Sequence, residues 1–215
     1  MRFLTTAALL TLTSVCQAQI PAPSTEPIPA GNYTLDKAHA SLLFRVEHLG
    51  FSNFTGRFTQ YDAKLDFDPR KPAAAKVDVS IDPRSISSDN APEGFLQSLA
   101  TGKDWLDAAE FPEIRYTSRR VEVVSPEELR VHGEITVRGI TRPLVLATNF
   151  NGGYAGHPFD PAARIGFSAR GSFKRSDFGV SFGVPTGGSK FGVGDEVQVI
   201  LEAEFTGPPL KVAQR

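Results

Sequence analysis

Cysteine, methionine and tryptophan are scarce in this chain of 215 residues, where each occurs once. The one cysteine, Cys16, lies in an N-terminal leader, so the domain after it has no disulfide and depends on its hydrophobic core. Net charge is also small, because 23 Lys and Arg nearly balance 24 Asp and Glu. Without an excess of basic residues to attract phosphates, nucleic acid is not an expected partner.

Long apolar runs are lacking as well, and none reaches the roughly 20 residues of a membrane-spanning helix. The apolar stretch Phe3–Val15 is short and interrupted by threonines, follows Arg2 and precedes small residues, which is typical of a cleaved signal peptide. We therefore expect residues 1–18 to be a signal peptide, export to the periplasm and no stable membrane insertion. Retention as an anchor is the weaker interpretation. Lipoprotein anchoring at Cys16 is disfavoured, because a valine precedes it.

Proline is concentrated in residues 19–30, where its fixed φ and missing amide hydrogen favour an extended linker. Residues 31–207 are long enough to bury one sizeable core, and we expect them to form a single domain. Residues 208–215 are interpreted as a C-terminal tail.

Apolar and polar residues alternate through most of this domain, as they do in strands with one buried face. The clearest example is 129–137, and β-type patterns recur in 42–48, 61–67, 77–81, 114–124, 144–150, 165–173 and 197–205. Short turns, such as Arg138-Gly139, require neighbouring strands to pair antiparallel. The sequence thus predicts an all-β domain of about eight antiparallel strands.

One segment has helical spacing instead. Pro92–Ala100 places Phe95 and Leu99 four residues apart, after Asp89 and Asn90, which are candidate helix caps. We expect one short helix there, in a connection between strands. The bulky residues that follow it indicate that the connection packs onto the strands and covers one end of them.

Strands with one apolar face form either a sandwich or a closed barrel, and alternation does not separate the two. The 16 phenylalanines, many of them at inward positions, favour a barrel with an apolar pocket, because phenylalanine offers large area with few rotatable bonds. A filled, phenylalanine-rich core remains the alternative. For the pocket, we predict a lining of Phe44, Val46, His48, Val79, Ile81, Ile135, Phe167 and Phe173, and a lid of Phe95, Leu99, Trp105 and Phe111.

Catalytic and metal-binding patterns are lacking. The four histidines, at positions 39, 48, 132 and 157, have no zinc-site spacing, and no nucleophile has an evident base. The loop 183–192 superficially resembles a phosphate loop, but no helix follows it. Lys190 within it remains a candidate contact for an anionic head group. We expect no catalytic residues, no metal and no cofactor.

Four blocks of sequence resemble the YceI-like proteins, which are periplasmic or secreted lipocalin-type barrels associated with polyisoprenoid binding. The blocks are His48-Leu49-Gly50 with Gly56 and Phe58, Asp104–Pro112, Gly133–Leu144, and Gly166-Phe167 with Arg175–Val180. The resemblance implies an eight-stranded antiparallel barrel with a long apolar interior. One departure concerns Glu93–Leu99, where many relatives have an Arg-Asp-x-His-Leu run, so head-group contacts made by that run do not carry over.

These observations predict a protein that binds an elongated apolar lipid, such as a quinone or a prenyl phosphate, and carries or sequesters it. A slender prenyl tail suits the interior of an eight-stranded barrel and binds through apolar burial alone. An enzyme acting on an isoprenoid, and a stress-related module with a filled core, remain the alternatives. A homodimer is also possible.

Overall fold

The computed structural model describes residues 26–187, 189 and 191–209. The predicted signal peptide with Cys16, most of the linker, Lys190 and most of the C-terminal tail lie outside the described residues. Among the described residues, no helix has the length and hydropathy needed to cross a membrane.

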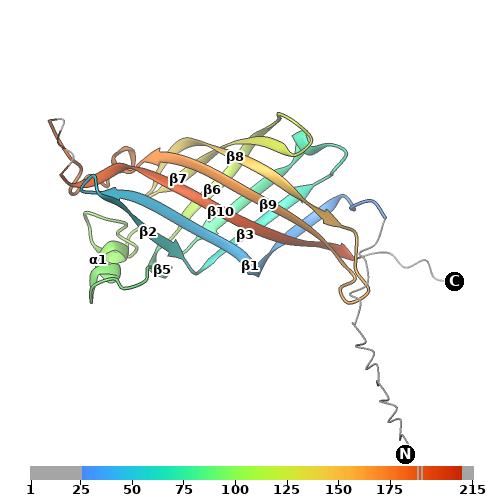
Figure 1. Cartoon of the computed structure of the whole chain (residues 1–215), viewed down its shortest axis with the longest axis horizontal. Coiled ribbons are helices and arrows are strands. Elements are labelled where there is room, and N and C mark those ends of the chain that lie inside the picture. Colours follow the sequence, from blue (N-terminus) through green and yellow to red (C-terminus); the bar gives the residue numbers. More distant parts are fainter. Residues whose placement is uncertain (1–25, 188, 190, 210–215) are drawn as a thin grey trace, which may run out of the picture.

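Eight of the strands close into an antiparallel barrel, in the ring order β1-β10-β9-β8-β7-β6-β4-β3 and back to β1 (Figure 1). This confirms the predicted fold class. The described strands are β1 (Gly31–His48), β2 (Ser52–Phe58), β3 (Tyr61–Phe67), β4 (Lys76–Ile81), β5 (Ile86–Ser87), β6 (Ile114–Val123), β7 (Glu128–Val137), β8 (Ile140–Tyr154), β9 (Ala162–Lys174) and β10 (Val193–Pro209). The strand β10 ends two residues beyond the predicted domain boundary.

The wall of the barrel changes along the length of β1. Near its start, residues 31–34 pair with β3, whereas residues 42–48 pair with β2. The strand β2 pairs in turn with the two-residue strand β5. Within the described chain, β5 has no pairing with β6, so one end of the wall is completed by the connection between β5 and β6 (Figure 1).

The tight turn between β7 and β8 shows why neighbouring strands pair antiparallel. Arg138 and Gly139 both have positive φ, 49° and 70°, which is the backbone of a two-residue hairpin turn. The turn had been predicted from this residue pair, and the strand pairing confirms it.

The predicted helix is present as α1 (Phe95–Thr101), within the connection between β5 and β6. The predicted caps are wrong, because the N-cap is Gly94, in a left-handed conformation with φ of 74° and no side-chain capping bond. Asn90 also has positive φ and lies in the preceding turn. Asp89 and Asn90 lie six and five residues before Phe95, too far along the chain to stand at the N-cap, and Gly94 takes that position because glycine adopts the left-handed conformation without a Cβ penalty.

Aromatic rings fill the end of the barrel near the two termini. Phe67, Phe150, Phe167 and Phe205 contact one another with ring centroids 5.3 to 6.2 Å apart, and Tyr33 closes the group edge-on against Phe67. Rings at these distances leave little room between them. We call this the termini end, and the opposite end, which carries α1, the helix end.

Candidate functional site

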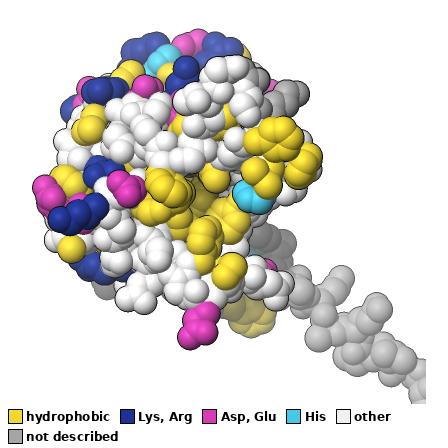
Figure 2. Space-filling model, turned by 90° about the vertical axis from the view of Figure 1, so that its left-hand side faces the viewer, with side chains coloured by type: hydrophobic (Ala, Val, Ile, Leu, Met, Phe, Trp, Pro, Cys, Tyr) yellow, Lys and Arg dark blue, Asp and Glu magenta, His cyan; other side chains and the backbone are white. Residues whose placement is uncertain are grey.

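The helix end holds a large cavity of about 960 Å³, which is at the upper limit of typical small-ligand pockets. Its lining comes from β1, β2, β4, β5, β6, β7, β9 and β10, and from the connection with α1. Seen from this end, hydrophobic side chains surround a hollow (Figure 2). The lining is predominantly apolar.

Most of the predicted site residues come together around this cavity. Nine of the twelve line it: Phe44, Val46, His48, Ile81, Phe95, Leu99, Trp105, Ile135 and Phe173. Val79 and Phe167 line a second, smaller cavity of about 110 Å³ nearer the termini end. Phe111 lines neither cavity, and instead packs below the β7–β8 turn, with the Arg138 guanidinium 5.8 Å from its ring centroid.

Period-two geometry explains how β1 lines the cavity. Leu42, Phe44, Val46 and His48 occupy alternate positions, so their side chains share one face. Phe44 lies opposite Gly56 of β2. A Cβ at Gly56 would lie 2.3 Å from the Phe44 ring, so only glycine leaves room for the ring to lie flat against β2.

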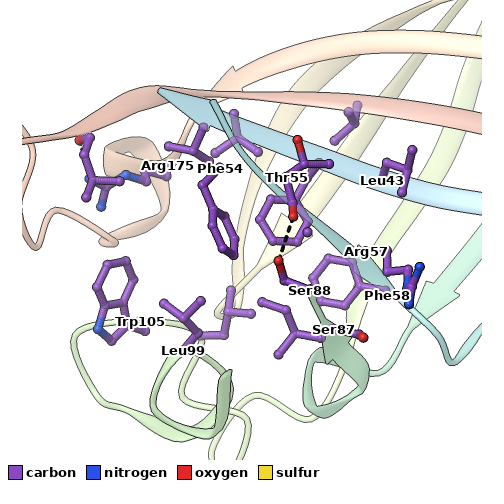
Figure 3. Close-up of a pocket in the computed structure, with 18 of the residues that line it drawn as sticks. Leu43, Phe54, Thr55, Arg57, Phe58, Ser87, Ser88, Leu99, Trp105 and Arg175 are labelled. Atoms are coloured by element: carbon purple, nitrogen blue, oxygen red, sulfur yellow. Dashed lines mark hydrogen bonds between the residues drawn. The ribbon is translucent and has the colours of Figure 1, made fainter. Parts of the chain in front are cut away.

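Aromatic contacts continue from β1 across β2 to the helix. The Phe44 ring lies 6.1 Å from Phe54 and 5.5 Å from Phe58, and Phe54 meets Phe95 of α1 at 5.8 Å. Figure 3 shows Phe54 and Phe58 on the side of the cavity opposite Leu99 and Trp105. Phe54 and Phe58 were missed as site residues, although they alternate with polar residues.

The most unusual lining residue is Arg175, whose side chain is 5% exposed. Its Nη1 donates to the carbonyl oxygens of Val180 and Phe182 at 2.9 Å each, Nη2 donates to Val193 at 2.7 Å, and Nε donates to Gly194 at 2.8 Å. Burial lowers the pKa of this guanidinium. The four bonds use four of the five N–H donors of the guanidinium and fix the loop after β9 to the start of β10.

Arg175 also connects this loop to the lid. Its guanidinium carbon lies 5.7 Å from the Trp105 ring, and Trp105 contacts Phe182 with ring centroids 5.4 Å apart. Sequence reasoning missed Arg175, although it continues the inward alternation through Gly171 and Phe173. The signal that could have identified Arg175 was a charged residue at a position that the alternation directs inward.

One rim of the cavity is polar. Ser88 donates through Oγ to the Thr55 carbonyl oxygen at 2.9 Å (Figure 3). Arg57 forms an ion pair with Asp89 at 3.5 Å. His48 is exposed at the end of β1. The rim thus offers hydroxyl, amide and imidazole groups to a polar head, while its arginine is already paired with a carboxylate.

Leu42 lies where the two cavities meet, because among the described residues it is the one that belongs to both linings. Beyond it, the small cavity ends against the aromatic cluster of the termini end, with Phe67, Phe167 and Phe205 in its lining. The interior therefore has a hollow half and a filled half. The long tunnel that a fully open barrel would give is shortened accordingly.

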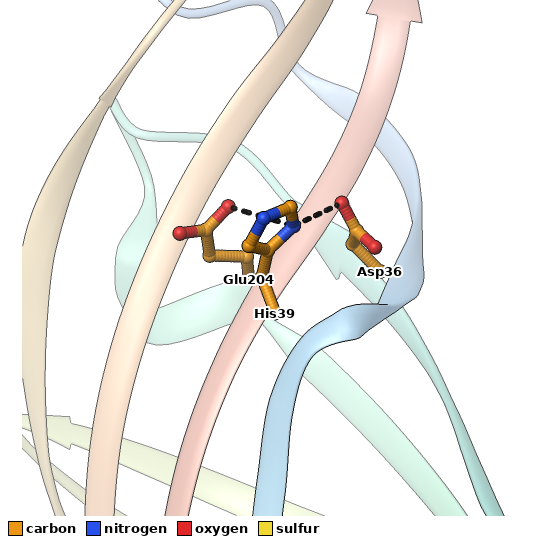
Figure 4. A group of neighbouring side chains, drawn as sticks. All are labelled: Asp36, His39 and Glu204. Atoms are coloured by element: carbon orange, nitrogen blue, oxygen red, sulfur yellow. Dashed lines mark hydrogen bonds and ion pairs between the residues drawn. The ribbon is translucent and has the colours of Figure 1, made fainter.

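A group of potential metal ligands lies outside the barrel, at the termini end. Asp36, His39 and Glu204 bring their ligand atoms within 4.8 Å of one another (Figure 4). Arg164 already bonds to Asp36 and to Asp160, and its Nη1 lies 3.6 Å from Glu204. The hydrogen bond that Arg164 donates, together with that from His39, holds the pKa of Asp36 well below the usual range. We interpret the group as an ion-pair network that joins β1, β9 and β10.

The fold and the cavity together define a lipocalin-like barrel with an apolar interior site. The chain belongs to the YceI-like domain family, whose model matches residues 33–205. The chain is 32% identical over 161 residues to a UPF0312 protein of Pseudomonas savastanoi pv. phaseolicola, which covers 73% of this chain and 80% of the relative.

Solved structures agree with this fold. The YceI protein of Campylobacter jejuni matches with a TM-score of 0.62 and 31% identity, covering 82% of this chain and 98% of that one. A polyisoprenoid binding domain from Saccharophagus degradans has a TM-score of 0.58 over the same shares of the two chains. At 12% identity, that second likeness concerns the fold alone.

Proposed function

We propose that this protein binds an elongated apolar lipid of the isoprenoid class in the large cavity, and carries or sequesters it in the periplasm. We further propose that it acts as a binding protein and not as an enzyme. The observation that carries the proposal is the 960 Å³ apolar cavity at the helix end. Membership of the YceI-like family, and the occurrence of the same fold in a polyisoprenoid binding domain, motivate the ligand class, and the signal-type leader motivates the compartment.

Apolar burial supplies the binding energy. Each methylene removed from water contributes about 0.8 kcal/mol, so a few isoprene units offset an association cost of about 4 to 15 kcal/mol. The aromatic walls suit a slender chain, because phenylalanine rings keep their shape when the cavity is empty. The polar rim around Ser88 then meets the head of the lipid.

The test is to purify the protein without detergent, extract it with organic solvent and identify lipids by mass spectrometry. We expect a stoichiometric isoprenoid with the wild type. Val199→Phe puts a ring into the cavity beside Gly171, its neighbour on β9, and should abolish the bound lipid while the barrel still folds. Val145→Phe, on the exposed outer face of β8, is the matched control and should retain it.

An empty wild-type protein that also fails to take up added farnesol would contradict the proposal. So would equal lipid content in the Val199→Phe and wild-type proteins, because the lipid would then bind outside this cavity. If the isoprenoid is chemically altered after incubation with the protein, the protein is an enzyme that acts on it, and the proposal of a carrier is wrong.

A further inference from the structure

Three exposed phenylalanines gather where the large cavity meets the surface of the helix end. Phe51 lies in the β1–β2 turn and is 78% exposed, whereas Phe182 and Phe191 lie in the loop between β9 and β10 and are 60% and 73% exposed. We call these three residues the mouth aromatics. Large aromatic side chains at such exposure lose contact with apolar surroundings, so a cluster of them marks an interaction surface.

The mouth aromatics are continuous with the cavity. Phe182 itself lines the cavity and contacts Trp105 of the lid at 5.4 Å. Phe51 and Phe191 contact each other edge-on, with centroids 6.4 Å apart. A molecule that covered the mouth aromatics would therefore lie over the opening itself, in contact with the lining.

A rigid frame holds these rings outward. The four bonds from Arg175 fix the backbone of the loop at residues 180 and 182 and of β10 at residues 193 and 194. The amide of Leu49 donates to the Gly192 carbonyl oxygen at 2.8 Å, which joins the β1–β2 turn to the same loop. The exposure thus belongs to a structure in which hydrogen bonds join the two tips.

The charge pattern of the two tips favours one kind of partner. The sequence has no acidic residue between Glu47 and Gly56, and none between Asp177 and Asp195. In the second interval its only charged residue is a lysine. Apolar tips without carboxylates meet no repulsion at an anionic lipid surface, where aromatic rings settle at the level of the head groups.

We infer that the mouth aromatics dock the barrel onto the surface of a lipid bilayer, so that a lipid passes between the bilayer and the cavity without crossing water. This inference rests on the proposed function, because it takes the cargo to be a membrane lipid. Transfer of a prenyl chain through water exposes its apolar surface to solvent, at a free-energy cost that grows with the exposed area. When the mouth touches the bilayer, the chain moves between membrane and cavity without exposure to water, and this free-energy cost is avoided.

The opposite end of the barrel provides a matched control. Phe159 is 78% exposed, as Phe51 is, but it lies in the β8–β9 connection at the termini end, next to the charged side chain of Asp160. Replacing Phe159 by serine therefore removes the same exposed ring from a place where no cavity opens.

The experiment is co-flotation of the purified protein with vesicles of phosphatidylethanolamine and phosphatidylglycerol. We expect the wild type and Phe159→Ser to float, and the double variant Phe51→Ser/Phe191→Ser to bind roughly tenfold more weakly, because binding scales with buried apolar area. A wild type that stays in the aqueous fraction would overturn the inference. So would an equal loss in Phe159→Ser.

Two further measurements separate the alternatives. Sedimentation of the free protein tests whether a second copy covers the mouth aromatics. A wild-type dimer that becomes monomeric in the double variant would overturn the bilayer assignment.

Farnesol supplied in detergent micelles tests binding in the cavity alone, and the double variant should bind it as the wild type does. Loss of that binding would place the two rings in the ligand site instead. If the wild type floats but binds no farnesol, the proposed function fails and docking stands.

Discussion

The two ends of the barrel use the same residue type for opposite purposes. At the termini end, Phe67, Phe150, Phe167 and Phe205 pack ring against ring and fill the interior. At the helix end, phenylalanines line the walls of a 960 Å³ cavity and leave its centre open. Phenylalanine content therefore does not predict a pocket by itself. The two ends differ in what closes the barrel wall: paired strands close it at the termini end, and the connection with α1 completes it at the helix end.

At each end of the barrel an arginine joins neighbouring segments, but the two arginines bond to different kinds of partner. Arg164 at the termini end bonds to the carboxylates of Asp36 and Asp160, on the outside of the barrel. Arg175 at the helix end is buried and bonds to four backbone carbonyls. The first arginine joins strands, and the second shapes a loop around an opening. We expect the filled end to supply stability and the hollow end to supply binding.

The largest expected effect on stability comes from the filled end. Phe67→Ala removes a ring that is 3% exposed and contacts Tyr33, Phe150 and Phe167, so the free energy of unfolding should fall by about 3 to 5 kcal/mol. Urea denaturation measures this. Phe54→Ala at the hollow end should cost less than half as much, and an equal cost would contradict the division between the two ends.

Leu42 tests the boundary between the two halves. Leu42→Ala should lower the free energy of unfolding by about 2 to 4 kcal/mol and join the two cavities. The variant should then prefer a prenyl alcohol longer than the one that the wild type binds best, as measured by fluorescence titration. If the preferred chain length does not change, Leu42 is not the barrier.

Gly56 tests the shape of the hollow end. Gly56→Ala places a methyl group within 2.3 Å of the Phe44 ring and should push that ring into the cavity, weakening lipid binding by about tenfold, at a cost of about 1 to 3 kcal/mol in stability. Gly166→Ala on β9 is the control, because its Cβ would meet only Asn151 at 3.7 Å. Unchanged affinity in Gly56→Ala would show that the Phe44 ring does not shape the site.

The smallest effect is expected at Arg164. Arg164→Met should lower the free energy of unfolding by about 1 kcal/mol at neutral pH, since the ion pairs are only partly shielded from water. Because Arg164 holds the pKa of Asp36 below its usual range, this contribution is present above about pH 4 and is lost as the pH falls through the folded-state pKa. Urea denaturation from neutral to acid pH should show the wild type and the variant converging.

Arg119→Met is the control for this prediction. Arg119 pairs with Glu134 at 2.7 Å, and both side chains are exposed, so loss of Arg119 should hardly change the free energy of unfolding. A constant difference between Arg164→Met and wild type down to acid pH would show that Arg164 stabilises the barrel through packing and not through its charge.

Alternation in the sequence predicted which face of each strand points inward, but it could not predict depth along the barrel. Val79 and Ile81 share one face of β4, and Phe167 and Phe173 share one face of β9, yet each pair divides between the small cavity and the large one. Depth depends on the stagger of neighbouring strands, which a single strand's pattern does not contain.

Residues outside regular strands were harder to place. Phe111 was predicted to belong to the lid, but a loop has no period from which its direction follows, and the ring packs under Arg138 instead. Trp105, in the same connection, does line the large cavity, where its bulky ring finds apolar cover. The inward position of Arg175 was not predicted, because a pattern of apolar and polar residues assigns every charged side chain to the solvent face.

The central claim is that the hollow half, and only that half, receives a slender apolar chain. Titration of the wild type with prenyl alcohols of increasing length tests it most directly. The account predicts affinity that rises with each isoprene unit and then levels off once the chain reaches Leu42. Equal, weak affinity for every length would contradict it, because no chain would then be buried.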